Sequence, residues 1–209
     1  MRTVRRAVDE ASLTRFTESF PPASVPVDTN PGNTCSSNPA LAWCYQYTNN
    51  QGTSRYHADN APPSTGGSLE AESSAVANAH LAGYREHFLP ATIGPGRQIR
   101  ARLWYKKTRG HAQTQLMDMF VELIATDGTV PVQWPVDAQQ IRTVNWTSMV
   151  TPTYTVLPGI TIDRIRLSFD IQNRASGGGA ASPSYVWFDD VQLEEPAGIL
   201  ALSWQELIN

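Results

Sequence analysis

Two adjacent carboxylates, Asp189 and Asp190, interrupt the aromatic and aliphatic run "YVWFDDVQLEEP" at residues 185–196. The run has the composition of a buried strand. A carboxylate inside such a strand is costly unless it is paired or bound to a cation. The doublet therefore predicts a structural partner, a metal ion or a catalytic task.

Signatures of a catalytic nucleophile are absent from the sequence. The four histidines lack metal-ligand spacing such as H-x-x-x-H, and no G-x-S-x-G elbow precedes a predicted helix. Paired acids such as Asp118 with Glu122 usually face solvent when they lie on strands. We therefore expect that the chain is not an enzyme.

The charge balance limits the classes of partner that the protein can bind. The 16 basic and 19 acidic residues give a net charge of -3, without the basic excess of nucleic-acid-binding proteins. No segment approaches a membrane span or the apolar core of a signal peptide. We expect neither nucleic acid nor membrane as a partner. Cys35 and Cys44 leave the existence of a disulfide open.

Alternating apolar and polar residues predict strands along most of the chain. In residues 98–106, for example, Ile99 and Leu103 share one face while Trp104 lies on the other. Residues 71–80 are also compatible with a helical turn. Taken together, the pattern predicts an all-β antiparallel sandwich over residues 16–196, with extensions at 1–15 and 197–209. The other expected strands are residues 13–20, 42–48, 54–59, 67–73, 83–93, 117–125, 143–159, 162–172 and 185–196, of which 143–159 is one long strand or two strands broken near Pro152.

The C-terminal extension is unusually apolar and needs a cover. Ser203 and Glu206 fit a helix-capping box, which favours a short amphipathic helix. The extension either folds back on the sandwich or docks on a partner, and for the second case we name as docking residues Ile199, Leu200, Leu202, Trp204, Leu207 and Ile208.

The order of the later segments resembles the jelly-roll carbohydrate-binding modules that are appended to xylanases and related glycosidases. The resemblance covers about residues 55–195 and rests on "GRQIRARLWYK", "VELIATDGT", "VNWTSMVTPTYTV", "DRIRLSFDIQ" and "VWFDDVQLEE", in that order. The resemblance implies a jelly roll and a non-catalytic, glycan-binding function.

The resemblance also gives the acidic doublet a role. In such modules a carboxylate of the last strand, a Glu of the N-terminal strand and backbone carbonyls hold a structural calcium ion. Here the corresponding residues are Asp189 or Asp190, with Glu18 as their partner. Calcium accepts such mixed shells of about six to eight oxygens. The alternative is a carboxylate that pairs with an Arg or caps backbone N–H groups.

In these modules aromatic rings stack on sugar rings, and polar side chains bind the hydroxyl groups. The outward positions of the predicted strands offer this mixture, whereas we assign Trp146 and Trp187 to the core. The ligand-binding candidates are Trp104, Arg100, Arg102, Phe120, Glu122, Arg164, Arg166 and Gln172.

Two functional hypotheses follow. The first is a glycan-binding sandwich, and the second is a structural virion protein, such as a decoration, head-fibre or tail component. The free-standing module, the missing signal peptide and the apolar tail favour the second. We combine them as a homo-oligomeric protein of the virion surface, made in the host cytoplasm, that attaches through its tails and binds host polysaccharide. The alternatives are a purely structural cement protein and an extracellular accessory module of a polysaccharide-active enzyme.

Overall fold

The structure is a computed structural model that describes residues 12–20, 44–61, 66–74, 79–107, 115–136, 143–173 and 184–196. Within these ranges the chain forms strands and turns. No helix in them is long and apolar enough to cross a membrane. The helical turn considered for residues 71–80 is not seen in its described parts, because residues 71–73 and 79–80 belong to strands.

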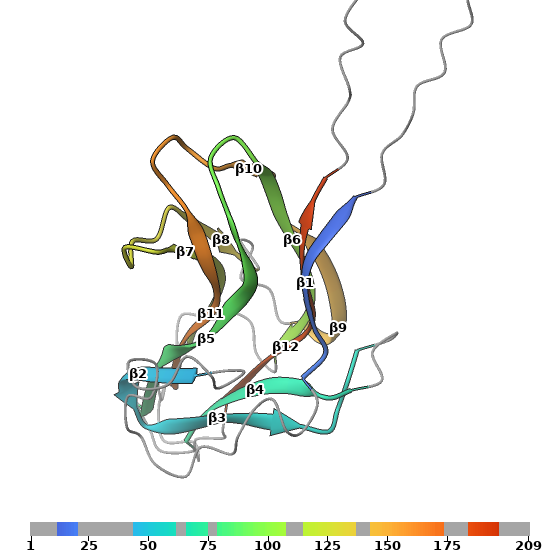
Figure 1. Ribbon diagram of the computed structural model, residues 1–209. Coiled ribbons are helices and arrows are strands. Elements are labelled where there is room, and N and C mark those ends of the chain that lie inside the picture. The colour runs from blue at the N-terminus through green and yellow to red at the C-terminus, as the bar shows by residue number, and fades with distance from the viewer. Residues whose placement is uncertain are drawn as a thin grey trace, which may run out of the picture.

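The strands form two antiparallel sheets that face each other (Figure 1). Sheet A has the order β10-β6-β12-β4-β3, with β1 also paired to β12 and β9 to β6. Its strands are β1 (Leu13–Glu18), β3 (Gly52–His57), β4 (Ser68–Ser73), β6 (Gln98–Lys107), β9 (Thr143–Val150), β10 (Tyr154–Thr155) and β12 (Ser184–Glu195). Sheet B has the order β2-β5-β11-β7-β8. Its strands are β2 (Cys44–Asn50), β5 (Ala79–Ile93), β7 (Gln115–Ala125), β8 (Val132–Pro135) and β11 (Ile162–Asn173).

The predicted all-β antiparallel sandwich is therefore confirmed. Alternation places the inward residues of both sheets in one core, as Leu103 of β6 and Leu167 of β11 illustrate, both fully buried. Each such side chain contributes about 1.5–3 kcal/mol on burial. Their outward neighbours form the two outer faces of the sandwich.

The acidic doublet marks the place where β12 changes partners. Residues before Asp189 pair with β4, and residues from Val191 onward pair with β1, along the same edge of the strand. Against β6, on the other edge, the register shifts between Asp189 and Gln192. Asp190 has a positive φ of 43°, a conformation that Asp adopts more readily than most residues. The bulge returns Val191 and Leu193 to the core, where both are fully buried.

The first and last described strands pair with each other. β1 and β12 are antiparallel neighbours, with Leu13 opposite Glu195. Glu195 is bound by Arg15 of β1 at 2.9 Å and by Arg97, which precedes β6. Leu13 and Glu195, near the two described ends of the chain, therefore lie side by side on sheet A.

Glu195 provides a test of this junction. Burial alone would raise the pKa of Glu195, but the hydrogen bonds and charges of Arg97 and Arg15 outweigh burial and hold the pKa below the ordinary value of 4.5. A carboxyl whose pKa is lower in the folded state stabilises above its unfolded pKa, and this contribution is lost as the pH falls through the folded pKa. We expect Glu195→Gln to lower the free energy of unfolding by up to about 1 kcal/mol at pH 7. The loss should shrink below pH 4, which urea unfolding at pH 7 and pH 3 would measure. An equal loss at both pH values would contradict the ionic role.

Candidate functional site

The structure divides the predicted ligand-binding residues between two opposite faces. Five belong to β7 and β11 and lie on the outer face of sheet B: Phe120, Glu122, Arg164, Arg166 and Gln172. The other three belong to β6 and lie on the outer face of sheet A: Arg100, Arg102 and Trp104. The two groups cannot contact the same part of one ligand.

An ionic network covers the centre of the outer face of sheet B. The carboxylate of Glu86, on β5, is only 3% exposed. One of its oxygens accepts a hydrogen bond from Arg164 at 2.9 Å, and the other accepts two from Arg166 at 2.9 and 2.8 Å. Because β11 lies between β5 and β7, its arginines reach carboxylates on both sides. Arg166 also lies 3.5 Å from Glu122 of β7.

A shallow depression of about 280 Å³ lies beside this network. Glu122 contributes a carboxylate that accepts hydrogen bonds from Ser168, at 2.7 Å, and from the amide of Gln133. Phe120 adds an aromatic ring. Three of the predicted residues line the depression, which is formed by Ala82, Gly83, Tyr84, Phe120, Glu122, Gln133, Arg166, Ser168, Phe169 and Asp170.

Tyr84 is a residue of this face that the sequence analysis did not select. The guanidinium carbon of Arg166 lies 3.9 Å from the centre of the Tyr84 ring, in a cation–π contact. Burial raises the pKa of Tyr84, although the charge of Arg166 opposes this, so the phenol is protonated at neutral pH. We had recognised residues 83–93 as a strand without assigning its faces. The alternation of Tyr84, Glu86 and Phe88 was the signal that could have identified them.

The edges of the face carry further polar contacts. His80 of β5 lies 2.8 Å from Asp170 of β11, and Arg164 lies 5.3 Å from the ring centre of Phe88. Gln172 continues the outward row of β11 one step beyond Asp170. Hydrogen-bond donors and acceptors therefore lie on the same face as the rings of Tyr84 and Phe120.

The predicted arginines on sheet A contact acids of their own sheet. Arg100 and Arg102 both bind Glu194 of β12, at 3.0 and 3.1 Å. Trp104 is half-buried on the same face. Burial alone would raise the pKa of Glu194, but the hydrogen bonds from Arg102 and Arg100 lower it below the ordinary value. This group of residues stabilises the pairing of β6 with β12.

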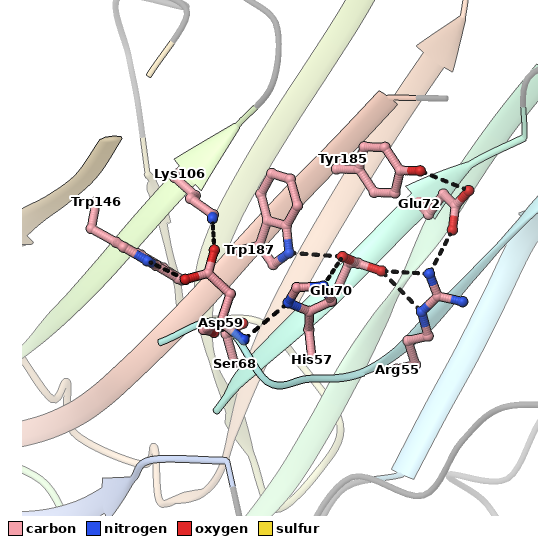
Figure 2. Close-up of polar contacts among 10 residues, drawn as sticks. All are labelled: Arg55, His57, Asp59, Ser68, Glu70, Glu72, Lys106, Trp146, Tyr185 and Trp187. Carbon is pink, nitrogen blue, oxygen red and sulfur yellow. Dashed lines mark hydrogen bonds and ion pairs between the residues drawn. The ribbon is translucent and has the colours of Figure 1, made fainter. Parts of the chain in front are cut away.

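The rest of the outer face of sheet A is crossed by the chain itself, as Figure 2 shows. Asp59, which follows β3, binds Lys106 of β6 and lies 3.4 Å from the indole nitrogen of Trp146 on β9. Burial alone would raise the pKa of Asp59, but its contacts with Lys106 and Trp146 lower it overall. The Asp59 backbone N–H donates to His57, at 3.1 Å.

Two predicted core tryptophans belong to this outer cluster. Trp187 is 8% exposed, but it lies beside Lys106 and donates a hydrogen bond to Glu70 at 2.9 Å (Figure 2). Trp146 is half-buried, with Lys106 over its ring at 4.9 Å. Trp187 is therefore buried as predicted, but under polar neighbours on the outer face rather than between the sheets. The assignment of Trp146 to the core was wrong, because its ring is only half-buried on that face. Tyr185 stacks on Trp187 from the next outward position.

Asp189 is fully buried beneath the same crossing segment. Its two carboxylate oxygens accept backbone hydrogen bonds, one from Ala61 at 2.7 Å and one from Asp190 at 2.6 Å. Asp189 therefore makes the backbone-capping contacts that the sequence left open as an alternative to a metal. These contacts attach the segment after β3 to the bulge of β12.

Two of the predicted metal ligands, Glu18 and Asp190, lie on neighbouring strands at the β1–β12 junction. Glu18 pairs with Val191, one residue beyond Asp190. One oxygen of Glu18 accepts the backbone N–H of Phe20 at 2.7 Å, and one of Asp190 accepts the amide of Gln192 at 3.1 Å. Within the described residues no three His, Cys, Asp or Glu side chains gather into a metal site. A calcium ion here would need backbone carbonyl oxygens for most of its coordination shell, and calcium accepts such ligands.

The predicted docking residues lie outside the described residues, as does Cys35. Their docking role and the disulfide therefore stay predictions.

Comparison with known proteins gives matches of structure alone. No family model matches the chain, and no curated protein matches it in sequence. Carbohydrate-binding modules, the family that the strand pattern resembles, are among the similar solved structures. The CBM22-1 xylan-binding domain from Paenibacillus barcinonensis Xyn10C is 14% identical, with a TM-score of 0.48, and the match covers 91% of this chain and 99% of that one. The family 11 carbohydrate-binding module from Clostridium thermocellum is 11% identical, with a TM-score of 0.40 and coverage of 74% and 89%.

A phage protein is also similar in structure. The enzymatically active domain of tailspike protein 4 from bacteriophage CBA120 is 12% identical, with a TM-score of 0.50. The match covers 80% of this chain and 21% of that chain, so the present chain spans about a fifth of the tailspike structure. At this identity the likeness concerns the fold.

We propose that a structural calcium ion binds at the β1–β12 junction, through Glu18 and Asp190 together with backbone carbonyls. An ion that binds only the folded state stabilises it by mass action. The chain should therefore unfold several degrees lower in a chelator than in calcium, by thermal scanning. Glu18→Gln should remove most of that difference, whereas Glu72→Gln, on β4, should keep it. Equal unfolding temperatures in chelator and calcium would reject the ion.

Proposed function

We propose that this protein is a non-catalytic glycan-binding module and that the ligand lies on the outer face of sheet B. The observation that carries the proposal is the depression between β5, β7 and β11, where Tyr84 and Phe120 adjoin Glu122, Arg166 and hydroxyl or amide groups. Aromatic rings match the apolar faces of sugar rings, and charged or amide groups match their hydroxyls. The resemblance of the later strands to carbohydrate-binding modules agrees with this ligand.

The ionic contacts of the face favour binding over catalysis. A general acid needs a carboxyl group that can donate its proton to the leaving group. Glu86 accepts three hydrogen bonds from two guanidinium groups, and Glu122 lies between Ser168, Gln133 and Arg166. Both carboxylates are therefore engaged within the protein, where they hold the donor groups of Arg164, Arg166, Ser168 and Gln133 in place around the depression.

The test uses a panel of soluble polysaccharides: xylan, mixed-linked β-1,3-1,4-glucan and a bacterial lipopolysaccharide O-chain. We expect at least one of them to bind by isothermal titration calorimetry. Tyr84→Ala and Phe120→Ala should each weaken binding about twofold to tenfold, since loss of an aromatic contact costs about 0.5–1.5 kcal/mol. The control is Leu157→Ala, because Leu157 is 56% exposed in the turn that follows β10. Failure of every polymer to bind would reject the function.

Attachment through the chain extensions is the second part of the proposal. Leu13 and Glu195, which lie next to the extensions in the chain, are neighbours on sheet A, while the proposed ligand face belongs to sheet B. A protein held by its extensions would keep that face accessible. We place such a protein on a virion surface, as a homo-oligomer; an extracellular accessory module is the alternative location.

The apolar C-terminal extension gives the test of attachment. In the full chain, Trp204→Ser with Leu207→Ser should convert an oligomer into monomers, because exposed apolar side chains need a partner surface. Analytical ultracentrifugation measures the mass, and Glu206→Gln serves as the control in the same segment. A wild-type chain that is already monomeric would contradict oligomerisation.

A further inference from the structure

A second and larger depression, of about 420 Å³, lies between β1 and β5. Sheet topology explains its position. β2 pairs with β5 from Leu81 only as far as Glu86, so from His87 onward this edge of β5 has no partner strand within the described residues. β1 of the other sheet lies beside this part of β5. The depression is lined by Thr14, Arg15, Phe16, Thr17, Glu18, His87, Phe88 and Pro90.

The lining combines apolar surface with polar groups, as the lining of the first depression does. Phe88 and Pro90 offer apolar surface, and the exposed Thr14 and Thr17 offer hydroxyl groups. Arg15 and Glu18 place one basic and one acidic side chain in the same lining. These groups suit an uncharged, hydroxylated ring better than an acidic sugar.

The surroundings of His87 determine the protonation and the tautomer of its imidazole ring. Burial lowers the pKa of His87, although the Phe88 carbonyl and Glu18 oppose this, so the imidazole is neutral at pH 7. Its Nδ1 lies within hydrogen-bond distance of the Phe88 carbonyl oxygen. A carbonyl only accepts, so Nδ1 carries the proton and Nε2 is the acceptor nitrogen. The ring is packed against Phe16, 4.9 Å between centres.

Arg15 adds a donor that the described residues leave without an acceptor. The side chain binds Glu195 through its terminal nitrogen, but its Nε atom is buried and has no hydrogen-bond partner among the described residues. Buried donors in proteins are normally paired. Because this one is closed to solvent in the structure, an acceptor in the depression would reach it only after the Arg15 side chain turns. Arg15 is the extra residue of the β1 bulge, between Thr14 and Phe16.

Phe88 connects this depression with the first one. Tyr84, Glu86 and Phe88 are successive outward residues of β5, so Tyr84 and Phe88 are separated by about 13 Å along the strand. Between them lies Glu86, held by Arg164, which also lies over the Phe88 ring. A ligand that contacts both aromatic residues must follow β5 and must be longer than one sugar ring.

We infer that the depression between β1 and β5 is a second glycan subsite, which takes an uncharged unit of the same chain that binds at Tyr84. The inference rests on the proposed glycan-binding function. It makes the ligand an extended oligosaccharide that runs along β5 toward β1, rather than a single terminal sugar. Arg15, Thr17 and Phe88 are the residues that distinguish long ligands from short ones.

The experiment compares disaccharide and hexasaccharide fragments of whichever panel polymer binds, by isothermal titration calorimetry. The wild-type chain should bind the hexasaccharide at least tenfold more tightly than the disaccharide. Thr17→Trp fills the depression from an exposed position and should abolish this preference. Leu157→Trp adds the same ring in a distant turn and should retain it.

A second pair of variants separates ligand contact from stability. Arg15→Lys removes the Nε donor and the guanidinium contact from Arg15 to Glu195. Arg97→Lys removes the guanidinium contact from Arg97 to Glu195 without altering the depression. We expect a severalfold loss of hexasaccharide affinity in Arg15→Lys and wild-type affinity in Arg97→Lys. Equal affinity for the two lengths, or a Thr17→Trp variant that keeps the preference, would overturn the subsite and leave the Tyr84 site standing. Failure of every panel polymer to bind would instead reject the glycan-binding function itself.

Discussion

The outer face of sheet B depends on two carboxylates that are almost completely buried. Glu86 and Glu122 are 3% and 6% exposed, and removal of one partner of a buried ion pair typically costs about 3–5 kcal/mol. Arg164 and Arg166 each contact more than one acceptor, so neither guanidinium can move without losing several bonds. The rings of Phe88 and Tyr84 lie against these two guanidinium groups. The carboxylates thus fix the arginines, and the arginines fix the aromatic rings.

Such a network is a poor source of stability, since well-packed apolar residues often replace buried ion pairs without loss. What the network supplies is geometry. Its donors and acceptors are held in fixed directions before any ligand arrives, and so are the rings that they support. Loss of side-chain conformational freedom is a large part of the free-energy cost of association. Side chains that are already fixed lose little of this freedom when a ligand binds. This fixed geometry suits the recognition role that we propose for the face.

The sequence predicted the strands well, because alternation requires only local information. Residues 98–106 and 162–172 alternate strictly, and the structure contains β6 and β11 there. Alternation separates inward from outward residues, but it does not tell which sheet a strand joins. Trp104 and Phe120 were therefore grouped together, although β6 and β7 belong to opposite sheets. Tyr84 gains its role only because β11 places Arg166 beneath its ring, and the burial of Asp189 on an outer face depends on a segment more than a hundred residues earlier in the chain.

The two outer faces carry similar residue types but differ in how far the chain itself covers them. Both carry Trp, Tyr or Phe beside Arg or Lys and Glu, which is why composition alone could not rank them. On sheet A the chain itself satisfies these groups: Asp59 binds Lys106, and Ala61 donates to Asp189 (Figure 2). On sheet B no described segment crosses the face, and the depression beside Tyr84 stays open. Because the segment after β3 covers part of one face and no described segment crosses the other, the topology of the loops, more than the residue types, determines which face stays uncovered.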